Sequence, residues 1–108
     1  MMILMRIERW DVRRDGALTD AALLHKLQAL GYDPVRCAYP TGAMAAAEID
    51  NRARVEAVIS GLIKITIDEE PAILTDGDIV FIPPRAARRL EVVGTTAAYC
   101  FEASRDQA

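Results

Sequence analysis

From Tyr39 onward, the sequence consists of short runs of β-forming residues separated by glycine, proline and other turn residues. The clearest run is residues 62–68, in which Ile63, Ile65 and Ile67 alternate with polar side chains. Because successive side chains of a strand point to opposite faces, the three isoleucines share one face. Short strands separated by turns at such intervals are typical of an antiparallel sandwich or barrel.

The other runs follow the same pattern. We expect further strands at residues 43–50, 55–60, 79–82, 88–93 and 97–102. Turns are predicted at Glu69-Glu70-Pro71 and at Asp76-Gly77-Asp78. The run 79–82 should end at Pro83-Pro84, because two prolines lack the backbone N–H groups that a strand ladder requires.

The N-terminal third contains a different pattern. Residues 1–10 alternate loosely, which predicts a strand with one buried face or an edge strand that pairs with a second subunit. A helix is expected to begin at Thr19 and Asp20 and to end at Gly31, which supplies a left-handed stop. The leucines that form its apolar stripe are Leu23, Leu24, Leu27 and Leu30.

Length and composition exclude several classes of protein. A chain of 108 residues with 52% hydrophobic content fits one domain with one aliphatic core. The net charge of -3 provides no basic surface, so we expect no nucleic-acid partner. Arg6 interrupts the apolar start after five residues, so we expect neither a signal peptide nor a membrane partner. We expect a cytoplasmic protein. Cys37 and Cys100 are far apart and fit small buried hydrophobes better than a zinc motif.

One glycine-led segment resembles the first conserved motif of the cupin superfamily. That motif places two histidines and a glutamate between two glycines. Gly42 and Gly61 match the glycines. Glu48 and Asp50 fall on the two histidine positions, and Arg54 falls on the glutamate position. The resemblance therefore lies in the turns and not in the metal ligands.

A second segment resembles the second cupin motif in the same way. Gly77 and Pro83 match its leading glycine and its proline. Arg85 replaces a glycine, Arg88 replaces the histidine, and Val92 replaces the asparagine.

The resemblance implies an all-β fold: a cupin jelly-roll barrel or sandwich of antiparallel strands with one short N-terminal helix. Residues 1–108 would form a single cupin domain, with a barrel core at about 36–103 preceded by a strand and helix within 1–31. Small cupins commonly form homodimers, so the first strand is expected to pair across a twofold axis.

The resemblance also implies that Glu48 and Asp50 face into the barrel. Two carboxylates in one cavity repel each other, and Arg54 and Arg88 provide two compensating charges, so we expect an ion-pair cluster where a relative holds its metal. An arginine about 4 Å from a cation costs on the order of 4 kcal/mol per unit charge at an effective dielectric of about 20. His25, the only histidine, lies in the predicted helix. We therefore expect no metal and no other cofactor.

Three functions remain open. The leading hypothesis is metal-independent binding of a small molecule, an anion being one candidate, in a pocket formed by Glu48, Asp50, Arg54 and Arg88. The alternative is an enzyme resembling the isomerase, epimerase or dioxygenase cupins, with Glu48 or Asp50 as acid or base. In the third, the protein is a dimerising module whose internal charges only hold the barrel closed.

Overall fold

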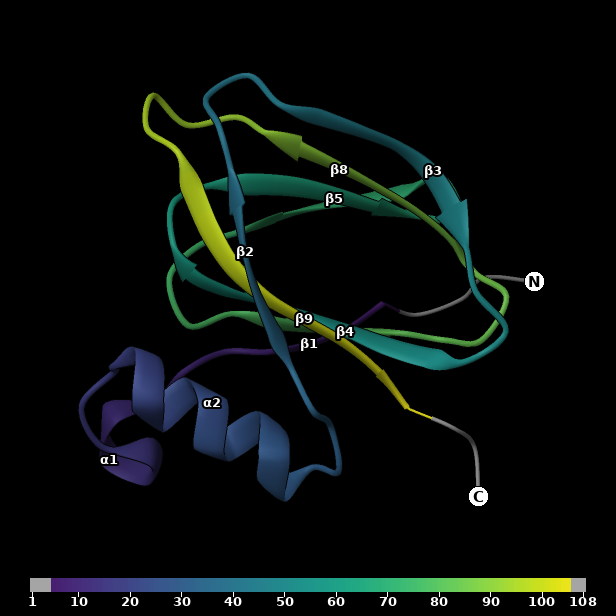
Figure 1. Cartoon of the computed structure of the whole chain (residues 1–108). Helices are drawn as coiled ribbons and strands as arrows, with labels where there is room; N and C mark the ends of the chain where they lie inside the picture. The colour runs from purple at the N-terminus through teal and green to yellow at the C-terminus, as the bar shows by residue number, and fades with distance from the viewer. Residues whose placement is uncertain (1–4, 106–108) are drawn as a thin grey trace.

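The computed structural model describes residues 5–105, which fold into two antiparallel sheets that face each other, with helices on the outer side of one sheet (Figure 1). In pairing order, the five-stranded sheet contains β1 (Arg6–Glu8), β7 (Ile79–Ile82), β4 (Ala53–Ser60), β9 (Ala98–Arg105) and β2 (Val35–Tyr39). The four-stranded sheet contains β3 (Met44–Ile49), β8 (Ala87–Val92), β5 (Ile63–Ile67) and β6 (Glu70–Leu74). The predicted all-β sandwich of antiparallel strands is confirmed.

The main core lies between the two sheets and results from the alternation seen in the sequence. Each strand directs every second side chain into this space. The four-stranded sheet contributes Ile63, Ile65, Ile67, Leu74, Leu90 and Val92, and the five-stranded sheet contributes Val58, Val80, Ile82, Ala98 and Cys100. The core is almost entirely aliphatic, which suits a chain with few aromatic residues.

The helix α2 (Asp20–Ala29) covers the outer face of the five-stranded sheet. Thr19 caps its first turn by accepting a hydrogen bond from the backbone N–H of Ala22, as the sequence predicts. Leu23 and Leu27 are fully buried against apolar side chains of the sheet. Gly31 follows the helix with a φ of +92°, so the predicted start and end of the helix are both confirmed.

A second helix, α1 (Val12–Asp15), was not predicted. It is a single turn in which Asp11 accepts a hydrogen bond from the backbone N–H of Arg13. Because α1 buries none of its residues, no apolar stripe marks it in the sequence. No helix within residues 5–105 is long and apolar enough to cross a membrane.

The turn predicted at Glu69-Glu70-Pro71 is wrong by one to two residues. The chain turns at Asp68 and Glu69, which have positive φ angles of 47° and 72°, and β6 already begins at Glu70. Pro71 therefore lies in a strand opposite Thr66. This is possible because β6 is the edge of its sheet, where a missing backbone donor is tolerated.

The strand predicted over residues 1–10 is shorter, and one strand was missed. In the described residues it comprises only Arg6–Glu8, and residues 1–4 lie outside the described part of the chain. The missed strand is Val35–Tyr39, which pairs with β9 at the other edge of the five-stranded sheet. Three of its residues are exposed, so it lacks the apolar run that marks the other strands.

A β-bulge in β3 determines which of its side chains enter the barrel. Ala45 pairs with Leu90 and Glu48 pairs with Arg88, so two alanines of β3 oppose the single residue between them on β8. In a regular strand, Glu48 would face away from the side on which Ala45 packs. The extra residue reverses this alternation and places Glu48 beside Arg88, at the rim of the space between the sheets.

Two motif glycines permit close approaches of the backbone. Gly61, between β4 and β5, has a φ of +115°, and a Cβ there would lie 2.8 Å from the Cα of Ala98. A Cβ on Gly77 would lie 2.5 Å from the Cβ of Trp10. Both glycines are therefore needed for the fold whatever the site contains.

Candidate ligand-binding site

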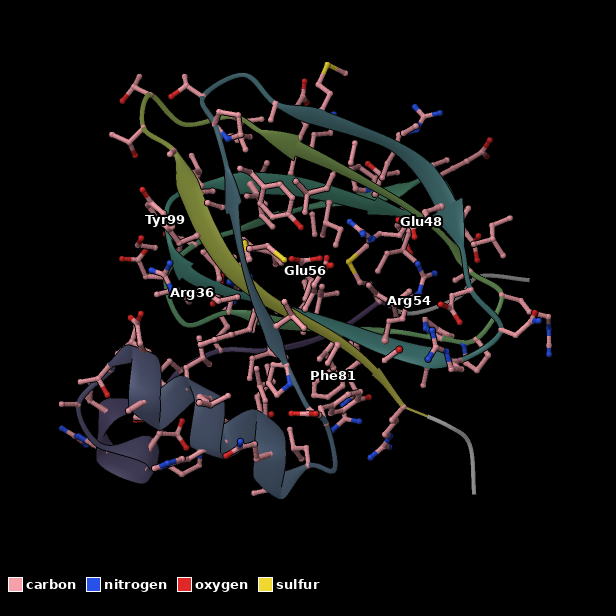
Figure 2. All side chains as sticks on the ribbon, viewed as in Figure 1. Arg36, Glu48, Arg54, Glu56, Phe81 and Tyr99 are labelled. Carbon is pink, nitrogen blue, oxygen red and sulfur yellow. The ribbon has the colours of Figure 1, made fainter. Side chains whose placement is uncertain are left out.

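A polar cavity of about 310 Å³ lies at one open end of the space between the sheets. All four residues predicted to form the pocket line it, and Figure 2 shows the labelled Glu48, Arg54 and Glu56 between the two sheets. The complete set of lining residues is Asp33, Val35, Glu48, Asp50, Arg52, Arg54, Val55, Glu56, Ile82, Arg88, Glu102, Ala103 and Ser104.

Arg88 lies among three carboxylates, and its side chain is only 10% exposed. Its Nη2 lies 3.4 Å from Glu48 Oε2 and 3.7 Å from Glu102 Oε2. Its Nη1 lies 3.6 Å from Glu56 Oε1, but has no hydrogen-bond partner within residues 5–105. Arg88 is thus a buried cation with one unused donor.

Arg54 is anchored to the main chain. Its Nη2 donates a 2.7 Å hydrogen bond to the carbonyl of Ala86, and its Nη1 donates a longer one of 3.4 Å to the carbonyl of Glu48. Its Nε has no partner in the described part of the chain. Burial, together with the charge of Arg88, lowers the pKa of Arg54, but a guanidinium stays protonated in proteins.

The expected ion-pair cluster forms only in part. Arg88 and Glu48 pair, although the Glu48 side chain is 66% exposed and lies at the cavity rim. Asp50 lies beyond the end of β3 and binds Arg52, with Nη2 of Arg52 3.1 Å from its Oδ2. Hydrogen bonds from Arg52 lower the pKa of Asp50 to about 2. The cavity therefore gathers the four predicted side chains without joining them in one network.

Glu56 was not predicted from the sequence, and at 1% exposure it is the most buried charged side chain of the site. Glu56 lies directly opposite Glu102 in the β4–β9 pair, and the Tyr39 hydroxyl lies 3.4 Å from Glu56 Oε2 and 3.1 Å from Glu102 Oε2. Burial raises the pKa of Glu56 to about 8, although the positive charge of Arg88 opposes this shift. The sequence feature that could have identified Glu56 is its position as the single carboxylate within the otherwise apolar run 55–59.

The thiols and the histidine add no nucleophile or ligand to the site. Cys37 and Cys100 are register partners in the β2–β9 pair. Burial raises the pKa of Cys37 to about 11 and raises that of Cys100 further. Both thiols therefore stay protonated at neutral pH. His25 is exposed on α2.

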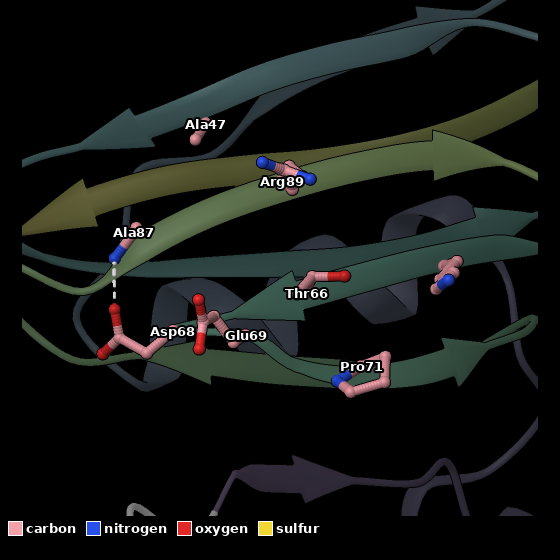
Figure 3. Close-up of a pocket in the computed structure, with 8 residues that line it drawn as sticks. Ala47, Thr66, Asp68, Glu69, Pro71, Ala87 and Arg89 are labelled. Carbon is pink, nitrogen blue, oxygen red and sulfur yellow. Dashed lines mark hydrogen bonds between the residues drawn. The ribbon is translucent and has the colours of Figure 1, made fainter.

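A larger hollow of about 840 Å³ lies on the outer face of the four-stranded sheet (Figure 3). Asp68 accepts a hydrogen bond from the backbone N–H of Ala87 there, which fastens the β5–β6 turn to β8. The charged side chains of this hollow, Lys64, Asp68, Glu69 and Arg89, are all exposed. We therefore take the smaller cavity between the sheets as the candidate site.

Two facing antiparallel sheets with a polar cavity at one end define a jelly-roll barrel. Within that class, the sequence profile described as "Cupin domain" matches residues 35–103. The match spans more than half of the chain, so the chain belongs to the cupin-domain family, as the glycine and proline positions predicted. A comparison with curated proteins found no match.

Several solved structures share this fold. The cupin domain of Cnp3 from Schizosaccharomyces pombe has a TM-score of 0.65 at 10% identity, covering 70% of this chain and 64% of that one. An RmlC-like cupin from Shewanella frigidimarina has a TM-score of 0.62 at 20% identity, with coverages of 68% and 64%. An RmlC-like cupin from Methanocaldococcus jannaschii has a TM-score of 0.61 at 19% identity, with coverages of 66% and 66%. This chain spans less than two thirds of each, and the likeness establishes the fold alone.

The cavity residues do not fit the divalent metal that this family commonly binds. Two of the four ligand positions hold Arg54 and Arg88, whose positive charges would repel a cation. Within residues 5–105, no group of three His, Cys, Asp or Glu side chains is placed to hold a metal ion. The carboxylates around Arg88 instead face its guanidinium.

Proposed function

We propose that this cupin domain binds a small anion in the 310 Å³ cavity, without a metal, through Arg54 and Arg88. The observation that carries the proposal is the pair of buried donors, Arg54 Nε and Arg88 Nη1, that have no hydrogen-bond partner within the described residues. Buried donors are nearly always paired, so two such donors beside one cavity favour an acceptor supplied from outside. A carboxylate or phosphate oxygen is an acceptor that a guanidinium binds well.

The alternative enzyme, with Glu48 or Asp50 as acid or base, has less support. Asp50 is held by Arg52 and its pKa is lowered to about 2, so it is a poor base at neutral pH. Glu48 is mostly exposed at the rim and bonded to Arg88.

A thermal-shift experiment tests anion binding. We expect one or more members of a panel of small carboxylates, sugars and sugar phosphates to raise the melting temperature of the protein. At 100 times the Kd the gain in stability should be about 2.7 kcal/mol. Arg88→Gln should abolish the shift. Arg89→Gln is the matched control, because Arg89 is the next residue of β8 but faces the outer hollow. The proposal fails if no compound stabilises the unchanged protein.

The expected homodimer is retained as a separate proposal. β1 forms one edge of the five-stranded sheet, and an edge strand can pair with that of a second copy. Light scattering should then give twice the chain mass of 11.9 kDa. A mass equal to one chain at all concentrations would contradict the dimer.

A further inference from the structure

The Tyr39 hydroxyl lies between two carboxyl groups and has only one proton to donate. Its oxygen lies 3.1 Å from Glu102 Oε2 and 3.4 Å from Glu56 Oε2. If both carboxyl groups were ionised, one of them would face the hydroxyl oxygen with no proton between them. The arrangement is satisfied when Glu56 is protonated and donates to Tyr39, which in turn donates to Glu102.

The charges around Glu56 lead to the same assignment. With Glu56 neutral, Arg52, Arg54 and Arg88 face the four carboxylates Asp33, Glu48, Asp50 and Glu102, so the cavity lining already carries one excess negative charge. An ionised Glu56 would add a second excess negative charge at a position that is 1% exposed, which is costly. The titratable and charged groups around it are Tyr39 and Cys37 on β2, Glu102 and Cys100 on β9, Arg88 on β8, and Arg54 on its own strand.

The protonation state of Glu56 controls the free donor of Arg88. Glu56 Oε1 lies 3.6 Å from Arg88 Nη1, the atom that has no hydrogen-bond partner within residues 5–105. An ionised Glu56 would compete with an incoming anion for Nη1 and would also repel it. A neutral Glu56 leaves Nη1 available, while Glu48 and Glu102 still surround the guanidinium and repel a second negative charge.

We propose that Glu56, as the neutral acid, keeps Arg88 Nη1 available to a ligand, and that Glu48 and Glu102 restrict this ligand to a small monocarboxylate. This inference rests on the proposed anion binding. The ligand class follows from the limited positive charge: one free guanidinium edge, surrounded by Glu48 and Glu102, can bind one carboxylate but disfavours a dianion.

The experiment measures the Kd of two probes between pH 6 and pH 9.5 by protein-observed NMR. Acetate is a monoanion and sulfate a dianion, and neither changes its charge in this range. We expect acetate to bind at least tenfold more tightly than sulfate at pH 6. Since the pKa of Glu56 is about 8, the Kd for acetate should be constant below pH 7 and should rise tenfold per pH unit well above pH 8.

Glu56→Gln separates the charge of Glu56 from its shape. The amide stays neutral, so the variant should bind acetate with a Kd that does not change up to pH 9.5, and more tightly than the unchanged protein at pH 9.5. The pH profile of the unchanged protein tests the inference even if this variant does not fold.

The possible outcomes distinguish the two proposals. Acetate binding with a constant Kd in the unchanged protein would overturn the role of Glu56 but leave anion binding intact. Sulfate binding as tightly as acetate would overturn the monocarboxylate assignment. The absence of binding by either probe at pH 6 would overturn the inference. If the compound panel also gave no thermal shift, anion binding itself would fail.

Discussion

Glu56 of β4 and Glu102 of β9 lie directly opposite each other in the sheet register, and their carboxyl groups share the hydroxyl of Tyr39. Like charges at directly opposed positions destabilise a sheet. The pair is therefore tolerated best with one proton between the two carboxyl groups. This relationship couples the stability of the barrel, and not only its cavity, to pH.

The first prediction concerns that coupling. In the folded protein the pKa of Glu56 is about 8, whereas the ordinary value is 4.5. Between these two pH values the unfolded chain releases a proton that the folded chain retains, so stability falls as pH rises from about 4.5 to about 8. Glu56→Gln removes this dependence. The free energy of unfolding of the variant, relative to that of the unchanged protein, should therefore increase by on the order of a few kcal/mol from pH 5 to pH 8. Urea unfolding at the two pH values measures this difference.

Glu70→Gln is the control for this measurement, because Glu70 is an exposed residue of β6. Its free energy of unfolding should equal that of the unchanged protein at pH 5 and at pH 8. If Glu56→Gln gave the same stability difference at pH 5 and pH 8, Glu56 would not titrate on unfolding.

The second prediction concerns the bulge in β3. Deleting Ala46 should leave a single alanine opposite Arg89 and convert the bulge into regular pairing. Glu48 would then lie two positions after Ala45, on the same face of β3, so its contact with Arg88 should persist in the NMR spectra of the variant. Ala46→Gly, which keeps the residue count and the bulge, is the matched control and should also retain the contact. Loss of the contact in the deletion variant alone would show that Glu48 needs the extra residue to reach Arg88.

The third prediction compares two glycines that both have positive φ angles. Gly61→Ala should destabilise the protein by more than about 2 kcal/mol, because the new Cβ would lie 2.8 Å from the backbone of Ala98. Gly42→Ala should cost only about 1 kcal/mol, since no atom lies within 4 Å of the position that the new methyl group would occupy. Chemical denaturation of both variants measures their free energies of unfolding. Equal losses in the two variants would mean that the close approach between Gly61 and Ala98 does not contribute to the cost.

The fourth prediction concerns the attachment of α2 to the sheet. Leu27 is fully buried, and Leu27→Ala should reduce the free energy of unfolding by about 2–5 kcal/mol. Gln28→Ala is the matched control, because Gln28 is the next residue of the helix and is exposed. Gln28→Ala should change the free energy of unfolding by no more than about 0.5 kcal/mol. Similar losses in both variants would indicate that α2 contributes through helix propensity and not through packing.

Periodicity and turn residues predicted most of the fold. The alternation in 62–68 and the leucines of α2 were visible because each buries one face of a regular element. β2 and α1 were missed because their residues are largely exposed and leave no apolar pattern. The turn near Pro71 was misplaced because proline also occurs in edge strands.

The candidate site was less predictable for a physical reason. Family spacing brought Glu48, Asp50, Arg54 and Arg88 to one cavity, but spacing does not show which charges pair. Asp50 pairs with Arg52, two residues away, because the local chain geometry brings the two side chains together. Glu56 lies outside the family's ligand positions, and its contact with Tyr39 depends on a pairing between distant strands.

The two main-chain hydrogen bonds of Arg54 have a consequence for ligand recognition. A free arginine side chain loses a large rotamer entropy when a ligand immobilises it. Folding has already fixed the guanidinium of Arg54 against the carbonyls of Ala86 and Glu48, so an incoming anion meets a preorganised donor. The barrel thus supplies in advance the ordering that a flexible surface site would have to obtain from the ligand.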